Sequence, residues 1–185
     1  MELYDSKEYK AKTVTLVFRR EQLLYDISNY AFVEGDIMGE DAEHARHQVK
    51  DIAEEGNVDR VNRVLNLAHD ECVEQFYPYT NEEVEDGERL DDTLVAPEEY
   101  TIVLKLPEGF AKSTLKLERT LIHEYMVCRV LQDWLSITFP NSAPNWEKKM
   151  IQLKSKMKTA LLSRNLPYDG SSNRFDLLVD LFVLY

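Results

Sequence analysis

Four side chains in the segment 40–51 have the types and the spacing of a metal site. They are Glu40, His44, His47 and Asp51. Intervals of four, three and four residues would place them on one narrow face of a helix, where carboxylate and imidazole groups can hold a divalent ion. The apolar residues that begin at Ala42 lie on the opposite face, whereas helical-bundle metal sites aim their ligands into the core. We therefore interpret the four residues as a polar face, and keep a metal-binding helical-bundle enzyme that uses His44 and His47 as an alternative.

The sequence His123-Glu124 begins like the helix of a zinc protease. The second histidine of that motif would stand where the chain has Val127, so the motif is incomplete. We interpret His123 as a hydrogen-bonded, buried histidine, and we interpret His69 in the same way. Charged residues of the same segment are expected to form ion pairs rather than an acid–base set: Glu118, Arg129 and Asp133.

Other catalytic signatures are absent from the sequence. It has no glycine-rich phosphate loop, no nucleophile elbow and no paired-cysteine motif. Cys72 and Cys128 fall at helical core positions, and two cysteines give no disulfide framework, which fits a reducing compartment. We therefore expect no enzymatic activity, no cofactor and two free, buried thiols.

Charge is unevenly distributed along the 185 residues, whose net charge is −12. Nine acidic residues and a single arginine lie between Asn81 and Glu99, and four of the nine are interface candidates: Glu82, Glu83, Glu85 and Asp86. The segment 141–165 carries six basic residues and one acidic residue, and five of the six are interface candidates: Lys148, Lys149, Lys154, Lys156 and Lys158. The net charge opposes the wrapping of nucleic acid, because affinity for a phosphate backbone comes from clustered Lys and Arg.

Two stretches, 13–19 and 100–106, alternate apolar and polar side chains, which is typical of half-buried strands. Each is followed by segments whose apolar residues recur every three or four positions, which predicts amphipathic helices. The expected helices span 21–38, 41–54, 58–77 and 113–137, and a last one follows Asn145. The expected fold is mainly α with a small β component, in which two strand-helix-helix units form a helical bundle with a short sheet.

These units predict the domain organisation. Residues 1–80 form the first strand-helix-helix unit, residues 81–99 an acidic linker, and residues 100–185 the second unit with an apolar C-terminal segment. The helix over 113–137 is apolar nearly all round, so it should be central or covered by a partner. Where this helix meets the last helix, we expect five side chains to be buried together: Leu121, Tyr125, Cys128, Leu153 and Met157.

The C-terminal segment 174–185 is almost entirely apolar and is expected to form a third strand or a short docked helix. Three of its residues are interface candidates: Phe182, Leu184 and Tyr185. No apolar run approaches the roughly 20 residues that a membrane span needs, and the N-terminus lacks the pattern of a secretory signal. We therefore expect a cytoplasmic protein that does not contact membranes.

The stretch from Tyr100 to Arg164 combines a strand, a long helix, a short Pro-rich turn and a second amphipathic helix. The long helix contains Leu121-Ile-His-Glu-Tyr-Met-Val-Cys-Arg-Val130. In element order and helix character, this third of the chain resembles the small helical head-to-tail connector proteins of tailed phages. The resemblance implies a non-enzymatic ring subunit between portal and tail, made in the host cytoplasm and carried in the virion.

An acidic loop and a basic helix on one subunit allow copies to contact each other head to tail, and such contacts close into rings when the rotation allows. We therefore expect a structural or interaction protein, a subunit of a larger assembly such as a phage neck ring. Its partners would be itself and other protein subunits, without sequence-specific binding of nucleic acid. The alternatives are the metal-binding enzyme and a small acidic regulator that binds a basic partner through residues 81–99.

Overall fold

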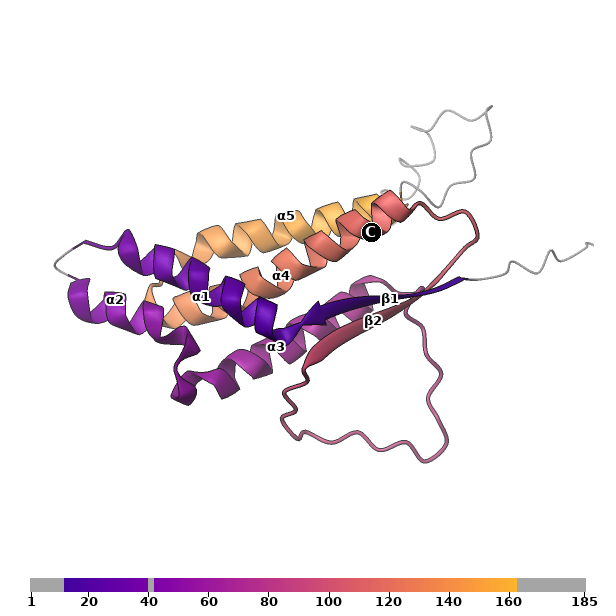
Figure 1. Ribbon diagram of the computed structural model, residues 1–185, viewed down its shortest axis with the longest axis horizontal. Coiled ribbons are helices and arrows are strands. Elements are labelled where there is room, and N and C mark those ends of the chain that lie inside the picture. Colours follow the sequence, from indigo (N-terminus) through magenta and orange to yellow (C-terminus); the bar gives the residue numbers. More distant parts are fainter. Residues whose placement is uncertain (1–11, 40–41, 163–185) are drawn as a thin grey trace, which may run out of the picture.

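The computed structural model describes residues 12–39 and 42–162 (Figure 1). These residues form a mostly helical protein with a small two-stranded sheet. In chain order the elements are β1 (Lys12–Arg19), α1 (Arg20–Asp36), α2 (Glu43–Lys50), the 3-10 turn η2 (Asp51–Ala53), α3 (Glu55–Gln75), β2 (Glu99–Leu106), α4 (Lys112–Thr138) and α5 (Ala143–Leu162). The expected fold class is confirmed. The C-terminal segment, with Phe182, Leu184 and Tyr185, lies outside the described residues.

The two predicted strands pair with each other. β1 and β2 run antiparallel, with Lys12 opposite Leu106 and Arg19 opposite Glu99. This register puts Leu16 opposite Ile102, and both side chains are buried on the same face of the sheet. The period-two alternation of the sequence therefore corresponds to one covered and one exposed face, as half-buried strands require. Because each strand comes from a different predicted unit, the two units share one sheet.

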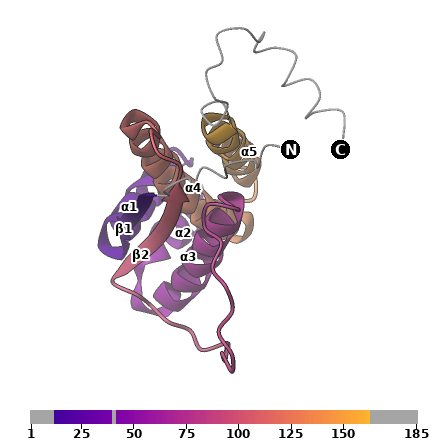
Figure 2. The same ribbon diagram turned by 90° about the vertical axis from the view of Figure 1, so that its right-hand side faces the viewer.

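The helix α4 lies at the centre of the molecule. It packs against α5 along its length and against α3 and α1 on its other sides (Figures 1 and 2). Twelve of its 27 residues are buried, including Ile122, Val127 and Leu131, which are fully covered. The expected cluster of Leu121, Tyr125, Cys128, Leu153 and Met157 is confirmed, because all five are buried in one continuous core.

The first helices differ from their expected boundaries. The helix expected over 41–54 is divided into α2 and the turn η2, although Val49 and Ile52 are buried as predicted. An amide hydrogen bond stabilises the break, since Asn57 Nδ2 donates to the Asp51 carbonyl oxygen at 2.8 Å. The helix α3 begins at Glu55, three residues earlier than expected, and its apolar stripe from Val61 to Cys72 is buried. None of the described helices is long and apolar enough to span a membrane.

The pairing of α4 with α5 predicts the effect of a core deletion. Leu153 is 7% exposed on the side of α5 that faces α4, so Leu153→Ala removes buried methyl groups and leaves a cavity. We expect it to lower the free energy of unfolding by about 2 to 5 kcal/mol in urea denaturation. Ile151→Ala on the same helix is the control, since Ile151 is 63% exposed and should change stability by less than about 1 kcal/mol. Equal losses in the two variants would contradict the packing.

Candidate functional site

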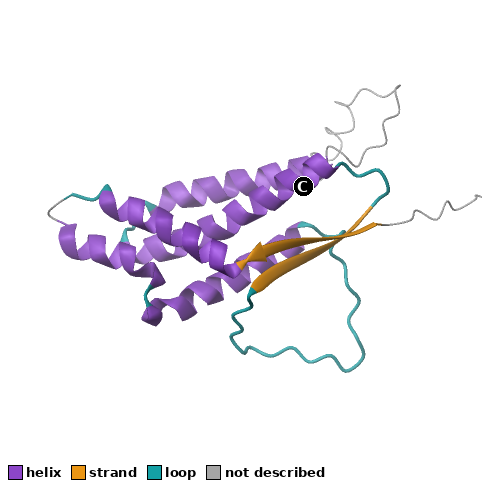
Figure 3. Ribbon diagram, in the orientation of Figure 1, coloured by secondary structure: helices purple, strands orange, loops and turns teal. Residues whose placement is uncertain are grey.

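The acidic segment forms an exposed arm. Residues 81–98, here called the acidic arm, contain no helix or strand and extend away from the sheet between α3 and β2 (Figures 1 and 3). Its four interface candidates are all exposed to solvent: Glu82, Glu83, Glu85 and Asp86. These carboxylates have no ion-pair partner among the residues of 12–39 and 42–162. The arm therefore presents a concentrated negative charge to its surroundings.

Both ends of the acidic arm are fixed to the body of the protein. At one end the Lys105 side chain donates a hydrogen bond to the Asn81 carbonyl oxygen at 2.8 Å. Towards the other end Asn66 Nδ2 donates to the Val95 carbonyl oxygen at 2.8 Å, and the Arg20 backbone N–H donates to the Glu98 carbonyl oxygen at 3.0 Å. The middle of the arm is thus held away from the core by ordered ends.

The acidic arm also exposes large apolar side chains. Val84 is 85% exposed and Leu90 is 90% exposed. Among the charged residues around them, Asp91 accepts a hydrogen bond from the Thr93 backbone N–H at 3.0 Å, which lowers the pKa of the Asp91 carboxyl. Exposed apolar residues inside a charged segment are the composition of a binding segment, because burial against a partner would remove them from water.

Two of the five predicted interface lysines on α5 form ion pairs with neighbouring helices, and their side chains stay 38% and 42% exposed. Lys149 Nζ lies 3.1 Å from Glu124 Oε2, and Lys154 Nζ lies 3.6 Å from Glu71 Oε2. Both side chains reach carboxylates of α4 and α3, because α5 packs on α4 through a wide face. The other three predicted interface lysines are exposed and have no ion pair among the described residues: Lys148, Lys156 and Lys158. The basic face of α5 is therefore smaller than expected.

A second basic surface, which the sequence reasoning missed, lies on the first half of α4. Its exposed residues, here called the basic face, are Lys112, Ser113, Lys116, Leu117, Arg119 and Thr120. The single acidic residue of this stretch, Glu118, is buried and turned away from solvent. The basic side chains recur at intervals of four and three, which is a signal for a common helix face, and none of them has an ion pair within the described ranges.

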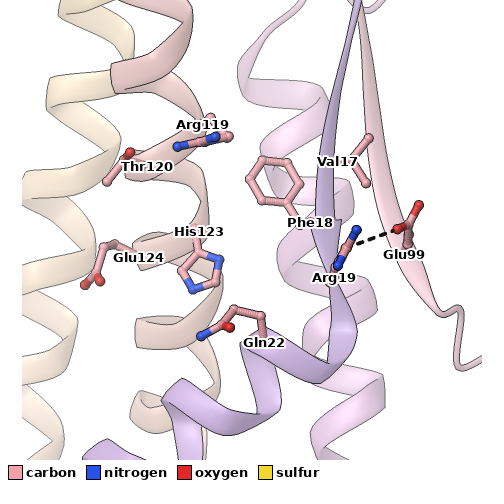
Figure 4. Close-up of a pocket in the computed structure, with 9 residues that line it drawn as sticks. All are labelled: Val17, Phe18, Arg19, Gln22, Glu99, Arg119, Thr120, His123 and Glu124. Carbon is pink, nitrogen blue, oxygen red and sulfur yellow. Dashed lines mark ion pairs between the residues drawn. The ribbon is translucent and has the colours of Figure 1, made fainter.

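A polar pocket of about 660 Å³ lies beside the basic face, between α4 and the junction of β1 with α1 (Figure 4). His123 Nε2 is 2.7 Å from Asp26 Oδ2, and Gln22 Nε2 donates to both carboxylate oxygens of Asp26 at 3.2 Å. The interpretation of His123 as a hydrogen-bonded histidine is confirmed, although its side chain stays 22% exposed. A carboxylate partner orients the imidazole as a general base requires. The hydroxyl that lines the pocket, on Thr120, donates instead to the Lys116 carbonyl oxygen at 3.1 Å.

The described residues among those considered for a metal site do not form a group that could hold a metal ion. Glu40 lies outside the described residues, and His44 and His47 are exposed on α2. His47 lines a pocket with Glu43, Arg46 and Lys50, and the positive charges of Arg46 and Lys50 oppose a bound cation. Within the described part of the chain, no group of three or more His, Cys, Asp or Glu side chains could hold a metal ion.

Glu118 is a buried carboxyl group that has no hydrogen-bond partner among residues 12–39 and 42–162. The expected ion pairs form for Arg129, whose Nε lies 3.6 Å from Glu71 Oε1, and for Asp133, which Arg60 contacts at 2.8 Å. Glu118 does not form the expected ion pair within the described residues, where neither carboxylate oxygen has a hydrogen-bond partner. Burial raises the pKa of Glu118 from its ordinary value of 4.5 to about 8, so the group is mainly protonated at neutral pH.

The two cysteines are free and buried, as predicted. Burial raises the pKa of the Cys72 thiol to about 12 and that of the Cys128 thiol to about 11. Reactive cysteines are exposed and have a lowered pKa, so both thiols are inert by these criteria. They serve as small apolar residues in the core.

Comparison with protein-family models found no match, and comparisons with curated proteins and with solved structures found none either. Function is therefore inferred from the chemistry of the surfaces described above.

Glu118 predicts a pH dependence of stability. Its pKa is higher in the folded state than in the unfolded chain, so unfolding releases a proton between about pH 4.5 and pH 8. The free energy of unfolding should therefore fall as the pH rises through this window. Glu118→Gln should flatten this slope and raise stability at pH 8 by an amount on the order of a few kcal/mol.

The matched control for this measurement is Glu147→Gln, because Glu147 is exposed on α5. Urea denaturation of the three chains at several pH values checks the prediction. An unchanged slope in Glu118→Gln would show that this carboxyl is not the cause.

The polar face of α2 predicts that stability is independent of metal. His44→Ala combined with His47→Ala should leave the melting temperature and any assembly unchanged, because both side chains are exposed. Elemental analysis of dialysed protein is the accompanying measurement. Stoichiometric zinc or iron that is lost in the double variant would instead support the metal-binding alternative.

Proposed function

We propose that the protein is a structural or interaction protein that works as a subunit of a larger assembly, most specifically of a phage neck ring. The observation that carries the proposal is the acidic arm. Its ends are ordered by hydrogen bonds, while its carboxylates remain unpaired in the described structure and Val84 and Leu90 lie in solvent. A partner that covers this segment would neutralise its charge and would remove its apolar side chains from water.

A second exposed apolar surface supports the same proposal. The outer side of α1 carries Tyr25, Phe32 and Val33, whose exposed fractions range from 52% to 66%, and Ile37 directly after the helix is 71% exposed. The opposite side of the same helix is buried through Leu23 and Ile27. A helix that is apolar on both sides is typical of one that packs on its own core and against a second molecule.

Charge and apolar contact have different roles in such an assembly. Each exposed ion pair contributes only about 0 to 1 kcal/mol and is screened by salt, with a Debye length of roughly 8 Å at physiological ionic strength. Opposite charges therefore guide docking, and apolar surfaces supply most of the adhesion. Heterologous contacts of this kind close into rings when the rotation between subunits allows. In the phage setting, the subunit would be made in the host cytoplasm and carried in the virion.

The acidic arm equally favours a second candidate function, a small acidic regulator that binds a basic partner. The ring subunit and the regulator differ in what they bind. A ring subunit associates with copies of itself or with other assembly subunits, whereas the regulator stays monomeric and binds a cationic surface of an unrelated protein.

The proposal predicts that self-association depends on the arm. We expect the full chain to form oligomers whose mass, measured by light scattering over a range of concentrations, decreases as salt is raised. Replacing the four arm acids Glu82, Glu83, Glu85 and Asp86 by their amides should weaken association. The control replaces four exposed acids elsewhere with the same change of charge: Glu54, Glu55, Asp59 and Glu74. A full chain that stays monomeric at high concentration with candidate partners present would favour the regulator.

The C-terminal segment gives a separate prediction. Removal of Phe182-Val-Leu-Tyr185 should abolish assembly, because the charged surfaces alone contribute too little adhesion. The same mass measurement checks it. Normal assembly of the shortened chain would exclude this segment from the interface.

A further inference from the structure

We infer that the basic face of α4 is the surface on which the acidic arm of a second copy docks, an inference that rests on the proposed function. The basic face carries Lys112, Lys116 and Arg119 and exposes no acidic residue, in a chain whose net charge is −12. Many other described cations are already in ion pairs, among them Arg60, Arg129 and the two α5 lysines that contact Glu124 and Glu71. Within the part of the chain that the structure describes, the basic face is therefore a concentration of positive charge without ion pairs, and it complements the arm.

The apolar part of the arm also has a counterpart. A groove of about 640 Å³ runs along the basic face between α4 and α5, and its lining includes Leu117, Leu121 and the hydroxyl residues Ser113 and Ser155. Leu117 is 50% exposed, so a leucine or valine of the arm would cover it. The Thr114 side chain, 4% exposed, lies in the wall of this groove.

The two surfaces lie on opposite sides of the molecule. In both views the arm projects below the sheet, whereas the first half of α4 lies above it (Figures 1 and 2). The hydrogen bonds at Asn81 and Glu98 hold both ends of the arm on its own side. The arm of one chain is therefore not placed to cover the basic face of the same chain. We infer that the arm of a second copy covers it. Residues 112–120 of a helix extend about 12 Å, and residues 82–85, which precede the turn at Asp86 and Gly87, would span a similar length in an extended conformation.

Charge reversal tests the pairing directly. One chain carries Lys112→Glu, Lys116→Glu and Arg119→Glu, and a second carries lysine at the four arm positions 82, 83, 85 and 86. Each chain alone should associate at least about tenfold more weakly than the original chain in sedimentation experiments. An equimolar mixture should regain association, because the reversed face then meets the reversed arm.

The control is Lys12→Glu with Arg63→Glu, which is compared with a face chain carrying Lys112→Glu and Lys116→Glu alone, because both make the same change of charge at exposed positions. The control should associate far better than that face chain. Circular dichroism and the melting temperature establish that every variant is folded.

Cross-linking then locates the contact. Leu90→Cys in the arm and Ser113→Cys on the basic face are introduced into two chains with tags of different size, and a short bifunctional thiol reagent should join them. The native Cys72 and Cys128 are fully buried, so the introduced thiols are the reactive ones. Ser136→Cys, exposed near the other end of α4, is the control position and should not cross-link to the arm.

The outcomes separate this inference from the proposed function. Association that persists in the face-reversed chain, or cross-links that form at Ser136→Cys instead, would overturn the inference and leave the proposed function intact. A chain that never associates would overturn both. If removal of residues 163–185 makes Ser113→Cys more reactive while no dimer forms, the chain's own C-terminal residues cover the face and the inference is wrong.

Discussion

The burial of α4 on several sides is the constraint on which the rest of the structure depends. The helix contacts α5, α3 and α1, so removing it would leave α5 and α3 without their main partner and would uncover part of α1. Side chains such as Ile122, Met126 and Leu131 have no exposed surface, and burial of each contributes about 1.5 to 3 kcal/mol. The middle of α4 is enclosed by its neighbours, whereas several side chains of its first half are exposed. A charged face can therefore reach solvent there. The position of the basic face therefore follows from the core.

The pairing of β1 with β2 has a similar effect on the acidic arm. The strands are separated in sequence by three α-helices, the 3-10 turn η2 and the arm, and their register brings Arg19 next to Glu99. Glu99 begins β2 directly after the arm, and Arg20 binds the Glu98 carbonyl at the same place. The sheet thus fixes the exit of the arm on the side of the molecule away from α4 and α5. Core packing and strand pairing together place the acidic arm and the basic face on different sides of the molecule.

Much of the fold could be predicted because side-chain period and burial are directly related. The alternation around Leu16 and the stripe from Val61 to Cys72 describe local geometry, and both were found as expected. The burial of the Glu118 side chain depends on which elements cover α4, and the position of Glu118 in the sequence does not reveal these elements. Its spacing of seven residues from buried Tyr125 was the available signal, since seven residues return to the same side of a helix. The ion pairs of Lys149 and Lys154 likewise depend on the partners of α5, which periodicity does not specify.

The attachment of the acidic arm at both ends also affects the entropy of any association. A free peptide with the sequence of residues 81–98 would have to give up the motion of its ends as well as of its middle when it is captured. In the protein, hydrogen bonds from Lys105, Asn66 and Arg20 have already fixed the ends during folding. Part of the ordering cost is thus met by the stability of the fold rather than by the contact. A weak, salt-screened contact can then become effective when it is repeated in a closed assembly, where each bound copy raises the local concentration of the next.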